Sequence, residues 1–348
     1  MKRCLPLIGA LLLLPAALGA ASVVLGAGDA IVHAVPGSIR VLSAGAAEPL
    51  SYPGLAYPGF GAVAPEQALA AIFDPVEDRL AIVASAGPPR IVELRDTPTA
   101  AGFLGSTLYV VSREKGTLTK IGSEGATASV RSSGSPGFIS ISDGAVFTYD
   151  PVRGLIERFD PVSLESSGTL TIDRFGSDFE TDGRSGYLAI PGTGEVISFS
   201  LSSLDGRKAL QGGAVPVDLV VERASGPLSP RTLAIADPAS RRIWRIEGQQ
   251  SGGAAFARGF LRGLIGLGLY APRLSDLPTG VDRIESAAGG LLAFDSSSGD
   301  LYWITSKTSE RIATGVDPSG YAWNGERVFY SAGGMLHSVS LGSPETAN

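Results

Sequence analysis

The chain has 348 residues, a formal net charge of −6, 46 glycines and 23 prolines, and only 18% of its residues are charged. This acidic balance gives no electrostatic footprint for nucleic acid or for an anionic membrane surface. The hydrophobic fraction of 44% is too high for a disordered protein, and the glycine and proline content is typical of a turn-rich all-β fold.

Residues 1–21 have the pattern of a secretory signal peptide. Lys2 and Arg3 precede the apolar run CLPLIGALLLLPAALGA, whose last residues are small enough for cleavage. An uncleaved N-terminal anchor is the alternative, but the run is interrupted by prolines and is shorter than the roughly 20 residues of a membrane span. We therefore expect a secreted or periplasmic mature protein, residues 22–348, with no membrane span. Its only thiol, Cys4, would be removed with the signal.

The mature chain begins with one hairpin-like piece, AIVHAVPGSIRVLS (30–43). The following Gly/Pro/Ala-rich stretch (43–67) is predicted to be a loop, because its residues are those that turns and loops favour.

From about residue 80 onward a unit of apolar strand, polar turn and apolar strand recurs. β-Branched and aromatic residues fill the runs, and Asp, Pro, Ser and Gly fill the turns, so each unit is predicted to be a β-hairpin. The seven copies are 80–94, 108–121, 145–159, 187–199, 233–246, 291–304 and 328–339.

Acidic residues recur at the start of these turns, at Asp150, Asp237 and Asp295. An Asp side chain at this position can accept hydrogen bonds from the backbone amides that follow it. We therefore interpret the three residues as structural turn residues and not as parts of a site.

The spacing of the units predicts the architecture. The strands before the turns end at intervals that average about 41 residues, which matches a four-stranded propeller blade of about 40–50 residues. We expect an all-β, single-domain β-propeller of seven blades with mostly four antiparallel strands, with six or eight blades as alternatives. The last unit leaves no chain for an outer strand, so residues 38–42 are predicted to close the ring by supplying it.

The units FTYDPVRGLIERFDPVSL (147–164), LAIADPASRRIWRI (233–246) and LYVVSREKGTLTKIG (108–122) resemble the blades of secreted bacterial YVTN/NHL-type β-propellers. This resemblance covers roughly residues 70–341 and implies a propeller fold. It implies no specific activity, because such propellers carry unrelated functions.

One long insertion, residues 252–280, separates two of the units. Its centre is apolar and rich in glycine, which indicates an outer strand with a loop or, alternatively, an exposed apolar patch for a partner. The candidate patch residues are Phe260, Leu261, Leu264, Ile265, Leu267, Leu269 and Tyr270.

Asp178, Glu180 and Asp182 are the candidate metal ligands, because acidic residues alternate ahead of a glycine as they do in calcium loops. The later acidic ligands of such a loop are missing, since its twelfth position is Ala189. A polar strand that enters an Asp-Gly turn is the favoured interpretation, so we expect no cofactor and keep calcium as an alternative.

Motifs of catalysis are absent from the sequence: it has no G-x-S-x-G, H-E-x-x-H or P-loop. We therefore expect a monomeric, non-enzymatic binding or scaffold module for a protein or glycan ligand. The alternative is a calcium-dependent propeller hydrolase or lactonase whose ligands come one per blade in the central channel. Such channel sites mix Asn with Asp and Glu, and Asn324 and Asn348 are the only asparagines.

Overall fold

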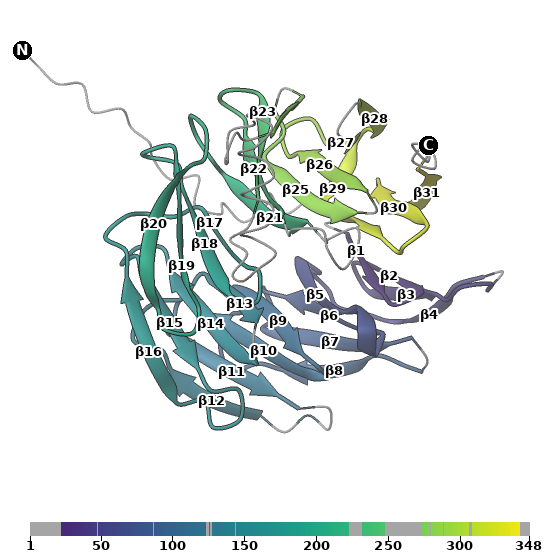
Figure 1. Ribbon diagram of the computed structural model, residues 1–348. Coiled ribbons are helices and arrows are strands. Elements are labelled where there is room, and N and C mark those ends of the chain that lie inside the picture. The colour runs from purple at the N-terminus through teal and green to yellow at the C-terminus, as the bar shows by residue number, and fades with distance from the viewer. Residues whose placement is uncertain are drawn as a thin grey trace, which may run out of the picture.

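The computed structural model describes residues 22–46, 48–85, 87–122, 125, 127–142, 144–222, 232–247, 273–278, 280–287, 289–305 and 308–341. The predicted signal peptide and the candidate patch within 260–270 lie outside these residues. The described chain is made of strands with one short 3-10 helix, Pro65–Gln67 (η1). Its sheets surround a central axis (Figure 1), which confirms the predicted all-β propeller architecture.

Six of the sheets have four antiparallel strands each. In every one, strands that are consecutive in the chain are neighbours in the sheet, and the first strands of successive sheets contact one another around the axis. The first three of these sheets consist of Phe60–Ala64 (β5), Leu69–Asp74 (β6), Arg79–Ala84 (β7) and Arg90–Glu93 (β8); Ala100–Leu104 (β9), Thr107–Ser112 (β10), Thr117–Ile121 (β11) and Thr127–Arg131 (β12); and Phe138–Ser142 (β13), Ala145–Asp150 (β14), Leu155–Phe159 (β15) and Ser166–Thr171 (β16).

The other three four-stranded sheets follow in chain order around the ring. They consist of Asp178–Thr181 (β17), Ser185–Ile190 (β18), Glu195–Ser200 (β19) and Asp205–Gln211 (β20); Asp218–Glu222 (β21), Thr232–Asp237 (β22), Arg242–Glu247 (β23) and Arg273–Asp276 (β24); and Arg283–Ala287 (β25), Gly290–Asp295 (β26), Asp300–Ile304 (β27) and Ser309–Ala313 (β28).

Strands from both ends of the described chain share one seven-stranded sheet, in the order β31-β30-β29-β1-β2-β3-β4. The structure therefore supports the alternative of six blades over the seven that the spacing favours, because six four-stranded sheets stand separately and the remaining strands are joined. The members of this sheet are Val23–Ala27 (β1), Ala30–Val35 (β2), Ser38–Leu42 (β3), Leu50–Pro53 (β4), Val316–Trp323 (β29), Arg327–Ala332 (β30) and Met335–Ser340 (β31).

The seam between the two ends differs from the predicted closure. Residues 38–42 form β3, which pairs with β2 and β4 and not with β31. The ends meet instead through β1 and β29, which run parallel with Val23 opposite Ser319. Gly26 permits this approach, because a Cβ there would lie 2.8 Å from the carbonyl oxygen of Trp323.

Asp317 fixes the seam with its side chain. Its Oδ2 accepts a hydrogen bond from the Ser22 hydroxyl at 2.6 Å and another from the Ser331 hydroxyl at 2.9 Å. The same carboxylate thus joins the start of the described chain to β30, and it does not cap a hairpin turn.

Hairpins of the predicted kind form between the second and third strands of the antiparallel units. Eight such pairs are present in the described residues: β2–β3, β6–β7, β10–β11, β14–β15, β18–β19, β22–β23, β26–β27 and β30–β31. The predicted copy at 80–94 is shifted by one strand, since it covers β7 and β8. The equivalent turn starts at Asp74, after β6.

The core lies between neighbouring sheets. Phe147 and Tyr149 of β14 pack in one buried cluster with Phe179 of β17 and Leu188 of β18. All six residues of β14 are buried, so both faces of this central strand are covered. Stacked sheets require such continuously apolar strands, and these hold the loops at the ends of the sheets in place.

Candidate binding site

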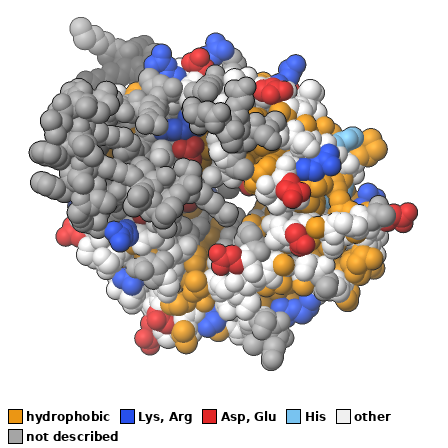
Figure 2. Space-filling model, turned by 45° about the vertical axis from the view of Figure 1, so that its right-hand side comes forward, with side chains coloured by type: hydrophobic (Ala, Val, Ile, Leu, Met, Phe, Trp, Pro, Cys, Tyr) orange, Lys and Arg blue, Asp and Glu red, His pale blue; other side chains and the backbone are white. Residues whose placement is uncertain are grey.

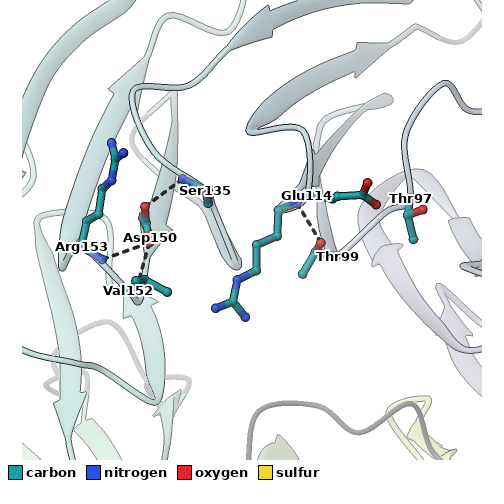
Figure 3. A pocket seen from close by; sticks show the side chains of 8 residues that line it. Thr97, Thr99, Glu114, Ser135, Asp150, Val152 and Arg153 are labelled. Carbon is teal, nitrogen blue, oxygen red and sulfur yellow. Dashed lines mark hydrogen bonds between the residues drawn. The ribbon is translucent and has the colours of Figure 1, made fainter. Parts of the chain in front are cut away.

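A cavity of about 500 Å³ opens where the sheet β9–β12 meets the sheet β13–β16. It lies on the connection face, which we define as the end of the ring at which the chain passes from one sheet to the next. Two inter-sheet connections and two hairpin turns form its walls (Figure 3). The lining residues are Thr97, Thr99, Arg113, Glu114, Ser135, Asp150, Val152 and Arg153.

Asp150 holds one wall of the cavity. Its Oδ1 accepts hydrogen bonds from the backbone amides of Val152 at 2.9 Å and Arg153 at 3.1 Å. Its Oδ2 accepts from the backbone amide of Ser135 at 2.8 Å, so the carboxylate joins the turn to the preceding connection (Figure 3). Asp150 is 2% exposed and both of its carboxylate oxygens accept backbone hydrogen bonds, so its role is structural.

The same arrangement recurs on the connection face. Asp74 accepts from the amide of Tyr57 at 2.8 Å, and Asp237 accepts from the amide of Ala214 at 2.6 Å. Asp295 accepts from the amides and hydroxyls of Ser297 and Ser298 in its own turn.

The opposite wall departs from this pattern, because the strand β10 ends in Ser112 where β6, β14, β22 and β26 end in Asp. The buried Ser112 hydroxyl has no hydrogen-bond partner among the described residues. Thr99 holds the turn instead, with its Oγ1 accepting from the backbone amide of Arg113 at 3.0 Å (Figure 3). In the part of the chain that the structure describes, no side chain pairs with the half-buried Arg113 guanidinium.

The remaining charged side chains of the lining already have partners. Arg153 donates from Nη1 to the carbonyl oxygen of Ser133 at 2.8 Å, and Glu114 pairs with Lys115 at 3.6 Å on the outside of the turn. The cavity can therefore offer an incoming group the Arg113 guanidinium and the hydroxyls of the threonines and Ser135.

A second polar site lies at the axis, where we call Asp178, Glu180, Asp218 and Glu285 the carboxyl row. Asp178 and Asp218 begin the adjacent first strands β17 and β21, and their carboxyls are hydrogen bonded to each other. Asp178 Oδ2 also accepts from the amide of Leu219 at 2.8 Å, and Asp218 Oδ2 accepts from the amide of Ile284 at 2.6 Å. Each carboxyl thus links its sheet to the next one.

The surrounding protein changes the proton affinity of these groups. Burial, with the negative charge of Asp178, raises the pKa of Glu180 to about 8. Burial and the neighbouring carboxyl also raise the pKa of Asp218 well above its usual range. Glu285 remains exposed, yet the protein that surrounds the channel raises its pKa to about 7. Figure 2 shows an opening near the middle of the ring with acidic side chains on several sides.

The three predicted metal ligands do not converge. Asp178 and Glu180 lie together in the carboxyl row, whereas Asp182 caps the turn before β18. Its Oδ1 accepts from the amides of Arg184 and Ser185, and its Oδ2 accepts from the Tyr187 hydroxyl. Among the described residues no group of three or more acidic, His or Cys side chains has the geometry to hold a metal ion.

A smaller hollow of about 190 Å³ opens on the other side of the axis, beside the seam. Glu285, Arg283 and Tyr321 line its polar side, and β1 with Phe60 and Gly61 lines its apolar side.

No helix in the described residues is long and apolar enough to cross a membrane.

The sequence did not point to Arg113 or to Asp218. One feature of the sequence could have identified Arg113: the pair Ser112-Arg113 stands where the turns after β6, β14 and β22 have Asp-Pro. Asp218 carries another, because it begins a first strand as Asp178 does.

No protein-family model matches the chain, and a search of curated proteins finds no match. Solved structures do resemble it. BamB from Moraxella catarrhalis has a TM-score of 0.61 at 12% identity, over 93% of this chain and 95% of that one. A catalytically inactive virginiamycin B lyase from Staphylococcus aureus with quinupristin has a TM-score of 0.59 at 13% identity, over 79% and 92%.

A hydrazine synthase structure from Kuenenia stuttgartiensis has a TM-score of 0.55 at 12% identity, over 91% of this chain and 94% of that one. At these identities the likeness shows the fold alone. It supports the predicted β-propeller fold, and the neighbours include both enzymes and BamB.

Proposed function

We propose that this protein is an exported, monomeric, non-enzymatic propeller that binds a protein or glycan ligand through the cavity on the connection face. The observation that carries the proposal is the lining of that cavity. Its one buried carboxylate, Asp150, is saturated by backbone amides, and its available groups are hydrogen-bond donors. Such a lining suits recognition, because it lacks an activated nucleophile paired with a base.

The rigidity of the walls supports the same function. Asp150 and Thr99 tie the connections and turns together through backbone amides, so the cavity exists before a ligand arrives. A preformed site loses little conformational entropy on binding. The N-terminal pattern of Lys2, Arg3 and the apolar run supports export to a secreted or periplasmic location.

The test is to fill the cavity and measure binding. Val152 is 69% exposed at the rim, so Val152→Trp can obstruct the cavity without disturbing the core. Val162→Trp is the matched control, because Val162 is 79% exposed in the turn before β16 and does not line the cavity. Ligands found on glycan and peptide arrays should lose binding to the first variant and keep it with the second; equal binding to both variants would contradict the proposed site.

The second candidate function is a calcium-dependent hydrolase or lactonase with its site in the channel. Its support is the hydrogen-bonded pair of Asp178 and Asp218 from two adjacent sheets, with the charge of Asp178 acting on Glu180. Calorimetric titration of the chain with Ca²⁺ decides between the two. Stoichiometric binding that is lost in Asp218→Asn would favour the channel enzyme, whereas no binding at millimolar Ca²⁺ would favour the binding module.

A further inference from the structure

Resting on the proposed function, we infer that the cavity recognises an acidic peptide segment of a partner protein, with Arg113 as the residue that receives a carboxylate. The inference starts from the turn after β10, which lacks the Asp-Pro pair that begins three other turns of the connection face. Turns at Asp74-Pro75, Asp150-Pro151 and Asp237-Pro238 share one pair of residues, and this turn has Ser112-Arg113.

The exchange reverses the local charge. An Asp at the end of β10 would be the partner for the turn amides and would place a carboxylate beside the cavity, as Asp150 does across it. Ser112 removes that charge, and Arg113 adds a positive one where Pro would have offered no donor. Thr99 Oγ1 takes over the structural hydrogen bond at 3.0 Å, so the turn keeps its shape while its chemistry changes.

Arg113 is in a position to bind an anion. It lines the cavity, its side chain is half-buried, and its guanidinium has no partner within the described chain. A guanidinium presents paired donors that match a carboxylate, and such bidentate contacts are among the stronger hydrogen bonds. Within the described residues the hydroxyls of Thr99 and Ser135 donate to no other group, so they can add further hydrogen bonds to the same anion.

The surrounding charges do not oppose an anion. The Asp150 carboxylate is 2% exposed and accepts from three backbone amides, and Glu114 has 71% of its side chain exposed and pairs with Lys115. Figure 3 shows Glu114 beside Thr97, on the side of the cavity away from Asp150.

The lining favours a peptide over a sugar acid. It contains no aromatic ring on which a sugar could stack, and it places the aliphatic side chain of Val152, 69% exposed, at the rim. A peptide can meet both features, with a Glu or Asp side chain on Arg113 and an apolar neighbour on Val152.

The experiment uses the full mature chain against a random displayed peptide library, followed by anisotropy measurements with synthetic peptides from the selection. The wild type should enrich Asp and Glu. Replacing the acidic residues of a selected peptide by their amides should weaken binding about tenfold or more, as should Arg113→Gln. Arg131→Gln is the matched control, because it makes the same exchange at an exposed position of β12, in the same sheet, that does not line the cavity.

A second variant guards against loss of folding. Ser112→Asp alone places a carboxylate beside Arg113, as in the neighbouring turns, and keeps the Arg113 amide that Thr99 accepts from, so the fold should survive, with an unchanged melting temperature, while acidic selection is lost. Selection of peptides without acidic enrichment, or equal losses in Arg113→Gln and Arg131→Gln, would overturn the inference.

The arms also separate this inference from the proposed function. Tetragalacturonate, an acidic oligosaccharide, serves as the second probe. If it binds and Val152→Trp blocks its binding while acidic peptides do not bind, the inference is wrong and the proposed binding module is supported. If Val152→Trp leaves every selected ligand bound, the proposed site itself falls.

Discussion

The seam and the carboxyl row both place titratable groups in the interior, but they shift proton affinity in opposite directions. At the seam, burial lowers the pKa of His33 to about 4, with the positive charge of Arg40 acting in the same sense and Asp317 against it. In the carboxyl row, burial and like charge raise the pKa of Glu180 to about 8. Burial disfavours the charged form in both places, so a base loses its proton and an acid keeps one.

Because of this difference, we expect the seam to lower the free energy of unfolding in acid and the carboxyl row to lower it in alkali. His33 is fully buried on β2 and neither ring nitrogen has a partner in the described chain. The carboxyl row faces the channel and is partly reached by water. Acid should therefore weaken the place where the ends of the ring meet, and alkali should weaken the links from β17 to β21 and β25.

The largest effect is expected from acid at the seam. The native pKa of His33 is about 4 and the unfolded value is 6.5, so the unfolded chain binds more protons between these values. The free energy of unfolding should thus fall by about 3 kcal/mol as the pH falls through this window. Urea unfolding at several pH values measures this loss. His33→Leu should remove it, and His337→Leu on the exposed β31 should not; an unchanged pH slope in His33→Leu would contradict the prediction.

The next effect concerns the hydrogen bonds across the seam. Asp317→Ala removes the acceptor for both Ser22 and Ser331, so the free energy of unfolding should decrease by about 2 kcal/mol. Asp160→Ala is the control, since its carboxylate accepts within a single exposed turn. A larger loss in the control, measured by urea unfolding at neutral pH, would show that the seam is not the weaker region.

A smaller and opposite effect is expected in the carboxyl row. Glu180 has a native pKa of about 8 against 4.5 when unfolded, so the native state binds more protons in this window. Stability should fall as the pH rises from 4.5 to 8, and Glu180→Gln should flatten that fall by about 1 kcal/mol, given partial screening by channel water. If urea unfolding shows the same alkaline slope in Glu180→Gln and wild type, this assignment is wrong.

The smallest effect is a change in pKa within the row. Asp178→Asn removes the negative charge that, with burial, raises the pKa of Glu180, so the pKa of Glu180 should decrease. Carbon-detected NMR titration of the Glu180 carboxyl measures the shift. Asp182→Asn lies in a separate turn and should leave it unchanged.

The repeat was readable from the sequence because each hairpin is a local structure. The alternation of apolar strand and Asp-led turn in 145–159 and 233–246 identified the hairpins and the propeller. The predicted hairpin at 80–94 is displaced by one strand from the observed one, because the run LAIVAS is as apolar as the strand before it and is followed by its own turn. As a result, the Asp74-Pro75 turn, which matches Asp150-Pro151, was not recognised.

The seam and the two sites could not be predicted from the sequence in this way, because each brings together residues that are far apart in the chain. Whether β3 or β1 meets the end of the chain depends on which strand edges come together in space, which hairpin patterns do not encode. The cavity is assembled from four separate loops, and the carboxyl row from residues such as Asp178 and Asp218 on successive sheets. What the sequence did contain was the break in the repeat at Ser112-Arg113.

The parallel contact of β1 with β29 also has a consequence for the order of assembly. Val23 must find Ser319, so the first strand of the described chain has no partner across the seam until nearly all of the chain is present. Contacts that distant in sequence slow folding and leave strand edges exposed meanwhile. For a chain that emerges from its N-terminus, β1 would have to wait for the last meander, and ring closure would be the final step.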